Sequence, residues 1–295
     1  MGARDVDASD GRADLHTHTT YSDGVLGPTD LVAAAAAVGL RTLGVTDHDT
    51  VAGLDEAEGA ARRHGLGFVP GLELSTGDDG DDIHLLGYFF ERTDPALLDA
   101  LAGFARQRLA RVNAIVSRLA DAGVMLDFDR VVALAGLGTA GRPHVARALI
   151  EAGHVADIGE AFDRFLRAGR LGFVPRAKLA PERAIAIVRA AGGAPTLAHP
   201  RSVGDLEATL ARLVPAGLVG LEVYYGEYDA ATRADLKRTA ERWDLVATGG
   251  SDFHGVGFKA GRDLGGPAVP EATVTRLRAA AMAVRAEAGT RAGAG

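Results

Sequence analysis

The chain has 295 residues, 47% of them hydrophobic, so it can bury a large core in one α/β domain or in a domain with an insertion. Its formal net charge of -7 argues against a general nucleic-acid-coating protein, which would need a basic surface. Cysteine is absent, which excludes disulfides, thiolate metal sites and a cysteine nucleophile. Any metal must therefore bind nitrogen and oxygen ligands, a donor set that favours Zn, Mn or Fe.

Both ends of the chain are polar or rich in Gly, Ala and Arg, and neither shows periodicity. We expect residues 1–12 and 287–295 to be disordered. The first segment lacks the apolar core of a signal peptide, and no apolar run is long enough for a membrane span. The sequence therefore favours a cytoplasmic protein without membrane contact, and it predicts no particular oligomeric state.

Short apolar runs of strand type alternate with alanine-rich helical stretches along most of the chain. The expected strand segments are 14–18, 41–46, 68–75, 83–90, 195–199, 220–224 and 245–249. The expected helices between them are 29–38, 51–64, 181–191, 205–213 and 230–242. This alternation predicts an α/β fold with a mostly parallel sheet or barrel and with helices on the outside.

The segment 95–170 interrupts this alternation. Its helical stretches follow one another without a convincing strand, at 95–122, 127–135, 143–152 and 157–167. We interpret the segment as a helical insertion that leaves the barrel and returns to it. The barrel itself would then comprise residues 13–94 and 171–286.

Nine residues of the types that bind metals lie at the ends of predicted strands. The carboxyl ends of the strands of a β/α barrel converge on one face, so residues far apart in sequence can meet there. A single histidine in such a place is more often a packing or capping residue than a ligand. Nine are hard to attribute to packing, because buried imidazoles and carboxylates are costly without partners. They are His16, His18, Asp23, His48, Glu73, His84, His199, Asp252 and His254.

Two pairs within this set have a spacing that suits a shared ion. His16 and His18 are two residues apart, so on an extended strand both imidazoles point to the same side and can reach one ion at about 2.0–2.1 Å. Asp252 and His254 repeat the spacing. The His-x-His pair alone leaves a packing role equally open, whereas the complete set predicts a metal centre.

The segments around these residues resemble the polymerase and histidinol phosphatase (PHP) superfamily. The matching stretches follow the order of the family, namely DLHTHTTYSDG at 14–24, GVTDHDT at 44–50, GLELS at 71–75, HLLGYFF at 84–90, AHP at 198–200 and GGSDFHG at 249–255. GRPHVARALI at 141–150 and AFDRFLRAGRLGFVPRAK at 161–178 are similar to the TrpH-like branch of nucleoside 3′,5′-bisphosphate phosphatases and 5′-3′ exoribonucleases. The chain departs from that branch at Phe165, where tyrosine is frequent, and at Arg167, where glycine is frequent.

The resemblance implies a distorted (β/α)7 TIM-like barrel that holds three divalent metal ions. The first ion would be bound by His16, His18, Glu73 and Asp252. Glu73 would bridge to a second ion, which would also be bound by His84 and His199. The third would be bound by Asp23, His48 and His254. A metal-bridging hydroxide would then attack the phosphorus, with no further catalytic residue from the chain, and Asp47 would orient a ligating imidazole.

Four basic residues in and after the insertion are candidates for contacting a phosphorylated substrate. They are Arg142, His144, Arg176 and Lys178. Arginine can bind a phosphate through two parallel hydrogen bonds. For Arg142 and His144 the alternative is an incidental place beside Pro143, which could simply start a helix. Three further arginines are expected on solvated helix faces, namely Arg147, Arg167 and Arg170.

Several other polar and aromatic residues allow more modest expectations. Asp49 is expected to cap the helix that follows it. His64 and His154 lie away from strand ends and are expected to be structural or surface residues. Tyr224 and Tyr225 follow a strand end, where a place in the pocket and a place in the core are both open.

The resemblance and the acidic charge favour a metal-dependent phosphoesterase that acts on a small nucleotide, a nucleoside 3′,5′-bisphosphate. Short 5′-phosphorylated RNA is a related substrate, and duplex DNA is not expected. Another role in the same superfamily, as a histidinol-phosphate phosphatase or a polymerase-associated editing nuclease, stays open. So does a catalytically silent module that binds metal or nucleotide. The GRPH segment at 141–144 argues against the first alternative, and the complete ligand set argues against the second.

Overall fold

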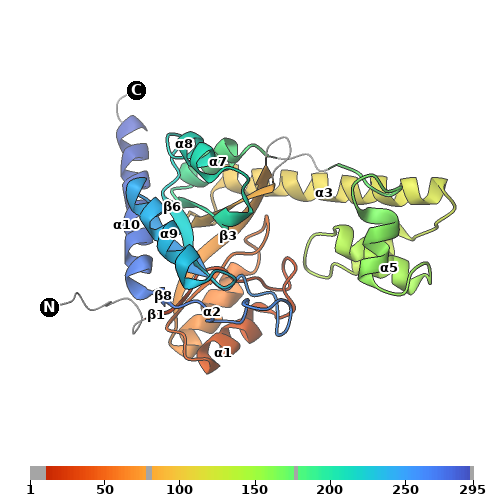
Figure 1. Ribbon diagram of the computed structural model, residues 1–295, viewed down its shortest axis with the longest axis horizontal. Coiled ribbons are helices and arrows are strands. Elements are labelled where there is room, and N and C mark those ends of the chain that lie inside the picture. The colour runs from red at the N-terminus through yellow and green to blue at the C-terminus, as the bar shows by residue number, and fades with distance from the viewer. Residues whose placement is uncertain (1–10, 78–81, 176–178, 293–295) are drawn as a thin grey trace. The chain divides into compact units, whose positions relative to one another are not determined.

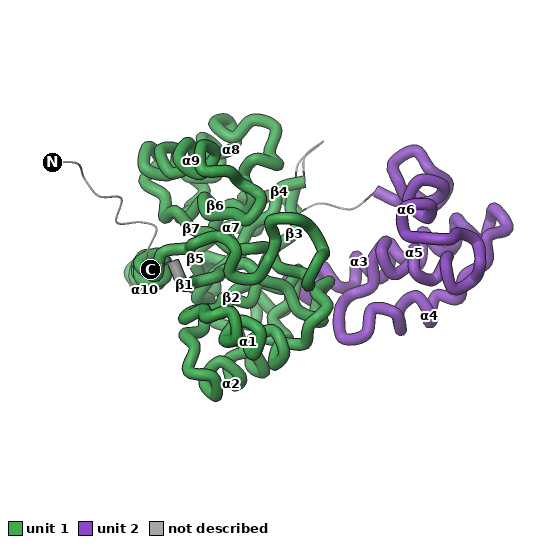
Figure 2. The backbone as a smooth tube through the Cα atoms, turned by 60° about the horizontal axis from the view of Figure 1, so that its bottom comes forward, with its two compact units in different colours: residues 1–99, 178–295 green, residues 100–177 purple. Residues whose placement is uncertain are grey.

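The computed structural model describes residues 11–77, 82–175 and 179–292 (Figure 1). The chain divides into two compact units (Figure 2). Unit 1 comprises residues 1–99 and 178–295, and unit 2 comprises residues 100–177. Helix α3 (Pro95–Asp121) contributes residues to both. Among the described residues, the helices are too short or too polar to span a membrane.

Within the described residues, unit 1 is built on an eight-stranded sheet in the order β7-β6-β5-β4-β3-β2-β1-β8. The strands are β1 (Gly11–Asp14), β2 (Thr42–Val45), β3 (Gly67–Gly77), β4 (Asp82–Tyr88), β5 (Ala194–Leu197), β6 (Gly220–Tyr225), β7 (Val246–Gly250) and β8 (Val269–Pro270). Just after β1, the amide of Leu15 donates a hydrogen bond to the carbonyl of Gly249 in β7 (3.2 Å). The sheet therefore curls into a nearly closed barrel.

The predicted α/β barrel is confirmed, with two differences in its strands. β4 is antiparallel to both β3 and β5, so the parallel pairs β1–β2, β2–β3, β5–β6 and β6–β7 are interrupted in the middle of the sheet. β8 is an additional antiparallel partner of β1. It has two residues, too few to show the alternating pattern by which a strand is recognised in a sequence.

Helices cover the outside of the barrel (Figure 1). They are α1 (Pro28–Ala37), α2 (Leu54–His64), α7 (Pro181–Ala190), α8 (Leu206–Leu213), α9 (Ala230–Arg242) and α10 (Glu271–Ala292). The short 3₁₀ turn η2 (Pro200–Ser202) follows β5. Pro28 and Pro181 occupy first turns, where a missing N–H costs nothing. Leu277 and Ala281 of α10 belong to the buried core of the barrel.

The two chain ends differ in part from the expected disorder. The first ten residues lie outside the described residues, but residues 11 and 12 belong to β1. At the other end, α10 runs through residues 287–292, where the sequence predicts a disordered tail. Glu287 pairs there with Arg189 of α7 (2.6 Å), which ties this part of the helix to the barrel.

Unit 2 is helical in its described residues. Besides α3 it contains α4 (Phe128–Ala133), α5 (Arg142–Glu151), α6 (Ile158–Ala161) and the π-helical turn η1 (Phe162–Leu166). Its interior is apolar, with buried residues that include Val112, Ile115, Leu119, Val131, Val145, Leu149 and Leu166. Its bounds, 100–177, lie a few residues after those of the insertion predicted at 95–170.

Candidate metal centre

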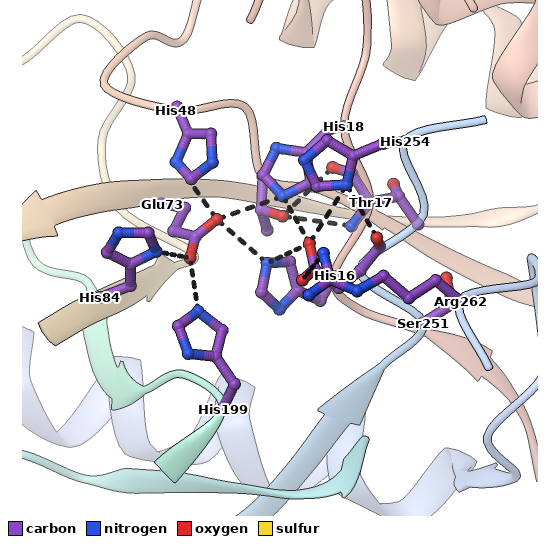
Figure 3. A network of polar contacts seen from close by, with 12 residues as sticks. His16, Thr17, His18, His48, Glu73, His84, His199, Ser251, His254 and Arg262 are labelled. Carbon is purple, nitrogen blue, oxygen red and sulfur yellow. Dashed lines mark hydrogen bonds and ion pairs between the residues drawn. The ribbon is translucent and has the colours of Figure 1, made fainter. Parts of the chain in front are cut away.

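The nine residues of the predicted ligand set come together at one end of the barrel. Figure 3 shows Glu73 and the six histidines of this set. The nine residues lie on or just after strands β1 to β5 and β7, with Asp23 in the loop before α1. Seven of them line a cavity of about 550 Å³, namely Asp23, His48, Glu73, His84, His199, Asp252 and His254. His16 and His18 lie beneath it, fully buried.

The backbone brings the two spaced pairs side by side. His16 O accepts a hydrogen bond from the amide of Asp252 (2.8 Å), and His18 N donates to the carbonyl of Phe253 (2.9 Å). This close approach requires a glycine, because a Cβ at Gly250 would lie 2.3 Å from the backbone nitrogen of His16. The extensions of β1 and β7 therefore hold both pairs against one another.

The carboxylate of Glu73 lies at the centre of the cluster. It is 1% exposed and comes from the middle of β3. Imidazole nitrogens surround both of its oxygens, at 3.1 Å (His16), 3.2 Å (His18) and 3.3 Å (His48) from Oε2, and at 2.7 Å (His84) and 3.3 Å (His199) from Oε1. One carboxylate therefore contacts five imidazoles from four segments of the chain (Figure 3).

Among the residues that the structure describes, three groups of side chains offer ligand atoms that lie within 4.8 Å of one another. The first is His16, His18, Glu73 and Asp252. The second is His18, Asp23, His48 and His254, and the third is His48, Glu73 and His84. The groups overlap, since His18, His48 and Glu73 each belong to two of them. His199 meets the cluster through Glu73.

The donor chemistry fits divalent cations. Among the described residues, His18 Nε2 and His48 Nδ1 are buried and have no hydrogen-bond partner, although both face Glu73 Oε2. A buried polar atom without a partner is costly. A cation between an imidazole lone pair and a carboxylate oxygen satisfies both, and such N/O sets are used by Zn, Mn and Fe.

The electrostatics describe a site that holds protons when it holds no metal. Burial lowers the pKa of His18, but the carboxylates of Asp252 and Glu73 outweigh it and raise this pKa to about 10. For His48, burial dominates and lowers the pKa to about 4. Burial raises the pKa of Glu73, yet the imidazoles around it, His48 foremost, hold that pKa well below its usual range. Glu73 is therefore ionised, and in the metal-free site protonated His18 supplies positive charge next to it.

Glu222 supports the cluster and was missed from the sequence. It is fully buried in β6, and its Oε1 accepts a hydrogen bond from His16 Nδ1 (2.9 Å). Its Oε2 accepts another from the backbone amide of His199 (2.6 Å). With Nδ1 as the donor, Nε2 of His16 presents its lone pair toward Glu73, the arrangement that orients a metal-binding imidazole. The available signal was a glutamate inside the otherwise apolar strand GLEVYY.

Two further side chains fix the orientation of Asp252. Its Oδ2 accepts a hydrogen bond from the hydroxyl of Tyr225 (2.8 Å) and pairs with Arg262 (2.7 Å). Oδ1 is thereby left to face the imidazoles, at 3.2 Å from His18 Nε2. Burial raises the pKa of Tyr225 far above its usual range, so its hydroxyl stays a donor. Of the two tyrosines left open by the sequence, Tyr225 lines the cavity and Tyr224 packs against the core.

Asp47 and Asp49 hold loops next to the cluster. Asp47 accepts hydrogen bonds from the amide and hydroxyl of Thr19 (2.7 and 2.6 Å) and from the hydroxyl of Ser22 (2.7 Å). Ser22 in turn lies 3.5 Å from Nδ1 of His18, so Asp47 reaches an imidazole only through a serine. Asp49 is not the N-cap of α2, contrary to expectation, because this helix starts five residues later at Leu54 and has Gly53 as its N-cap. Its side chain accepts a hydrogen bond from the Ser75 amide instead (2.9 Å).

Two of the four basic residues proposed for substrate contact belong to the described part of unit 2. Arg142 and His144 begin helix α5 of unit 2, where His144 Nδ1 accepts a hydrogen bond from the amide of Gly141 (3.0 Å). The guanidinium of Arg142 lies over the ring of Phe162 (5.7 Å). Arg176 and Lys178 lie outside the described residues. Exposed positions are found, as expected, for Arg147, Arg167, Arg170 and His64.

Comparison with known proteins identifies the family. The PHP domain family matches residues 14–167. A 5′-3′ exoribonuclease of Haemophilus influenzae is 38% identical over 245 residues, which cover 82% of this chain and 89% of that protein. A 3′,5′-nucleoside bisphosphate phosphatase of Chromobacterium violaceum is 34% identical over 257 residues, covering 85% and 90%. The chain belongs to the PHP family.

A solved PHP-like structure agrees with this assignment. A Bifidobacterium adolescentis protein assigned as a metal-dependent phosphoesterase is 32% identical, with a TM-score of 0.80 over 91% of this chain and 96% of that one. Family membership and the histidine–carboxylate cluster together make this PHP protein a metal-dependent phosphoesterase, a hydrolase of phosphoester bonds.

Proposed function

We propose that this PHP protein removes a phosphate from a nucleoside 3′,5′-bisphosphate and also acts on short RNA with a 5′ phosphate. The observation that carries the proposal is the overlap of the three donor groups around Glu73. Shared ligands let several ions act on one phosphate. The names of the two relatives, an exoribonuclease and a bisphosphate phosphatase, supply the substrate class. The acidic charge of the chain favours a small or short substrate over duplex DNA.

We further propose three divalent ions of Mn, Fe or Zn. Their ligands would be His16, His18, Asp23, His48, Glu73, His84, His199, Asp252 and His254. When bound, the ions would supply a hydroxide nucleophile at neutral pH and neutralise the phosphoryl oxygens. Glu222 holds His16 in the tautomer that offers Nε2, and Arg262 holds Asp252 with Oδ1 turned inward.

For the substrate we propose additional contacts from Arg142, His144, Arg176 and Lys178. Arg142 is partly exposed, and its contact with the face of Phe162 leaves the N–H donors in the guanidinium plane available for phosphate oxygens.

A substrate panel tests the proposal. The purified protein with Mn²⁺ is assayed on adenosine 3′,5′-bisphosphate, a short 5′-phosphorylated RNA and histidinol phosphate. We expect hydrolysis of the first two. Hydrolysis of histidinol phosphate alone would show that the substrate class is wrong. A protein that purifies without Mn, Fe or Zn and gains no activity when they are added would be a silent binding module.

Single substitutions test the metal assignment in the same assay. His16→Ala should abolish activity, because this imidazole is part of the first donor group. His84→Ala is a second variant whose side chain is 25% exposed, so its removal disturbs the core less. His154→Ala in unit 2, whose imidazole contacts only the Met125 carbonyl among the described residues, is the control. Circular dichroism checks the fold, and near-normal activity of both cluster variants would contradict the assignment.

A further inference from the structure

Phe258 and Arg201 line the metal cavity without belonging to the metal centre. Phe258 lies in the loop after His254, and Arg201 lies in the turn η2, two residues after His199. His254 and His199 approach the cluster from different sides (Figure 3). An aromatic ring and a cation are thus present next to two different ligand imidazoles, at the mouth of one cavity.

The ring of Phe258 presents a flat apolar surface. It stacks on the imidazole of His254 with a centroid distance of 4.7 Å and an angle of 13°. The side chain nevertheless remains 56% exposed. Val256 in the same loop is 93% exposed but does not line the cavity. An exposed aromatic face beside a nucleotide-sized cavity is suited to stacking on a base.

Among the described lysines and arginines that line the cavity, Arg201 is the one whose side chain forms no ion pair. Lys259 pairs with Glu227 (2.7 Å), and Arg262 pairs with both Glu227 and Asp252 (2.7 Å each). In the part of the chain that the structure describes, Arg201 has a hydrogen bond only from its backbone amide, to the hydroxyl of Tyr228 (3.0 Å). Its guanidinium therefore has all of its donors available for an anion.

We propose that Phe258 stacks on the base of the nucleotide and that Arg201 binds the phosphate group that is not cleaved. The inference rests on the proposed function and assigns part of its substrate selectivity to the barrel unit. The cavity of about 550 Å³ is of the size that small ligands occupy. A nucleoside bisphosphate would then be preferred for two separable reasons, its base and its second phosphate.

The test crosses protein variants with substrates that lack one feature each. The substrates are adenosine 3′,5′-bisphosphate, adenosine 3′- and 5′-monophosphate, and glycerol 2-phosphate, all assayed with Mn²⁺. The variants are Phe258→Ala, Phe258→Trp and Arg201→Ala. The matched controls are Val256→Ala, from the same loop, and Arg276→Ala, an exposed arginine of α10 outside the cavity. Metal content is measured for each protein.

Phe258→Ala should lower kcat/KM about 10-fold more on the adenosine nucleotides than on glycerol 2-phosphate, chiefly through KM, and tryptophan should restore it. Arg201→Ala should lower kcat/KM about 10-fold more on the bisphosphate than on either monophosphate. Equal losses on every substrate, or losses matched by the controls, would overturn the inference and leave the proposed function standing. A wild-type enzyme that cleaves glycerol 2-phosphate but no nucleotide would overturn both.

Discussion

The barrel unit and unit 2 bury different kinds of side chains. At the metal end of the barrel, His16, His18 and Glu73 are at most 1% exposed and face one another. In unit 2 the interior is apolar, and the ion pair of Arg130 with Glu151 is largely exposed. Apolar packing explains unit 2 without a ligand. Buried charged groups gathered in one cluster are not explained by packing, and this contrast indicates where the chemistry takes place.

Glu73→Gln should have the largest effect and tests the contrast directly. The amide keeps the size of the side chain but removes the charge that two donor groups share. We expect activity to fall by at least about 1000-fold, because several kcal/mol of metal-derived stabilisation are lost. Metal analysis and steady-state kinetics measure the effect. Glu151→Gln in unit 2 is the control, and a Glu73→Gln enzyme within 10-fold of the wild type would contradict the metal assignment.

Leu149→Ala makes the opposite change, in the apolar core of unit 2. The leucine is fully buried, so its truncation should lower the free energy of unfolding of that unit by about 3 kcal/mol. Denaturant titration measures the loss, and the metal content of the protein should be unchanged. Leu137→Ala, at a leucine that is 69% exposed, is the control. Loss of metal from the Leu149 variant would show that the barrel depends on unit 2.

The same contrast explains what could be predicted from the sequence. The barrel strands were recognisable because short apolar runs end in ligand-type residues, as His16 and His18 do after β1. The candidate ligand set could be predicted from residue type and from position at the end of a predicted strand. Glu222 and Arg262 were not recognised, and for Tyr225 the sequence left a place in the pocket and a place in the core open. Their roles follow from contacts with residues elsewhere in the chain, namely His16 for Glu222 and Asp252 for Tyr225 and Arg262. The spacing of residues along the chain does not predict such tertiary contacts.

The errors of sequence reasoning also have physical causes. Asp49 precedes a helix and is of a capping type, but the chain turns at this residue (φ 54°) and directs its carboxylate to β3. The tail from residue 287 is rich in Ala, Gly and Arg, so it lacks an apolar pattern, yet the ion pair of Glu287 with Arg189 joins it to α7. In both cases a tertiary contact decides between conformations that local sequence leaves equally open.

Glu222→Gln should have an intermediate effect. The glutamine can still contact His16 Nδ1 but loses the charge that favours an Nδ1–H donor. We expect metal affinity and activity to fall about 10- to 100-fold, the range found for residues that orient a ligand. Titration with Mn²⁺ measures the affinity, and Glu207→Gln, an exposed residue of α8, is the control. An unchanged Mn²⁺ affinity would mean that Glu222 only supports the backbone of His199.

The smallest expected effect is the change of metal affinity with pH. In metal-free protein the pKa of His18 is about 10, above the ordinary value of 6.5, so His18 carries a proton at pH 8. The stability this proton adds is complete below pH 6.5 and is lost as the pH rises through 10. Metal binding needs the free lone pair, so it must release the proton, and affinity should rise about tenfold per pH unit for each proton released. His48, with a pKa of about 4, releases none. Calorimetric titration with Mn²⁺ between pH 6.5 and 8.5, in buffers of different ionisation enthalpy, measures the Mn²⁺ affinity and the number of protons released. An affinity that does not change with pH would refute the protonated state of His18.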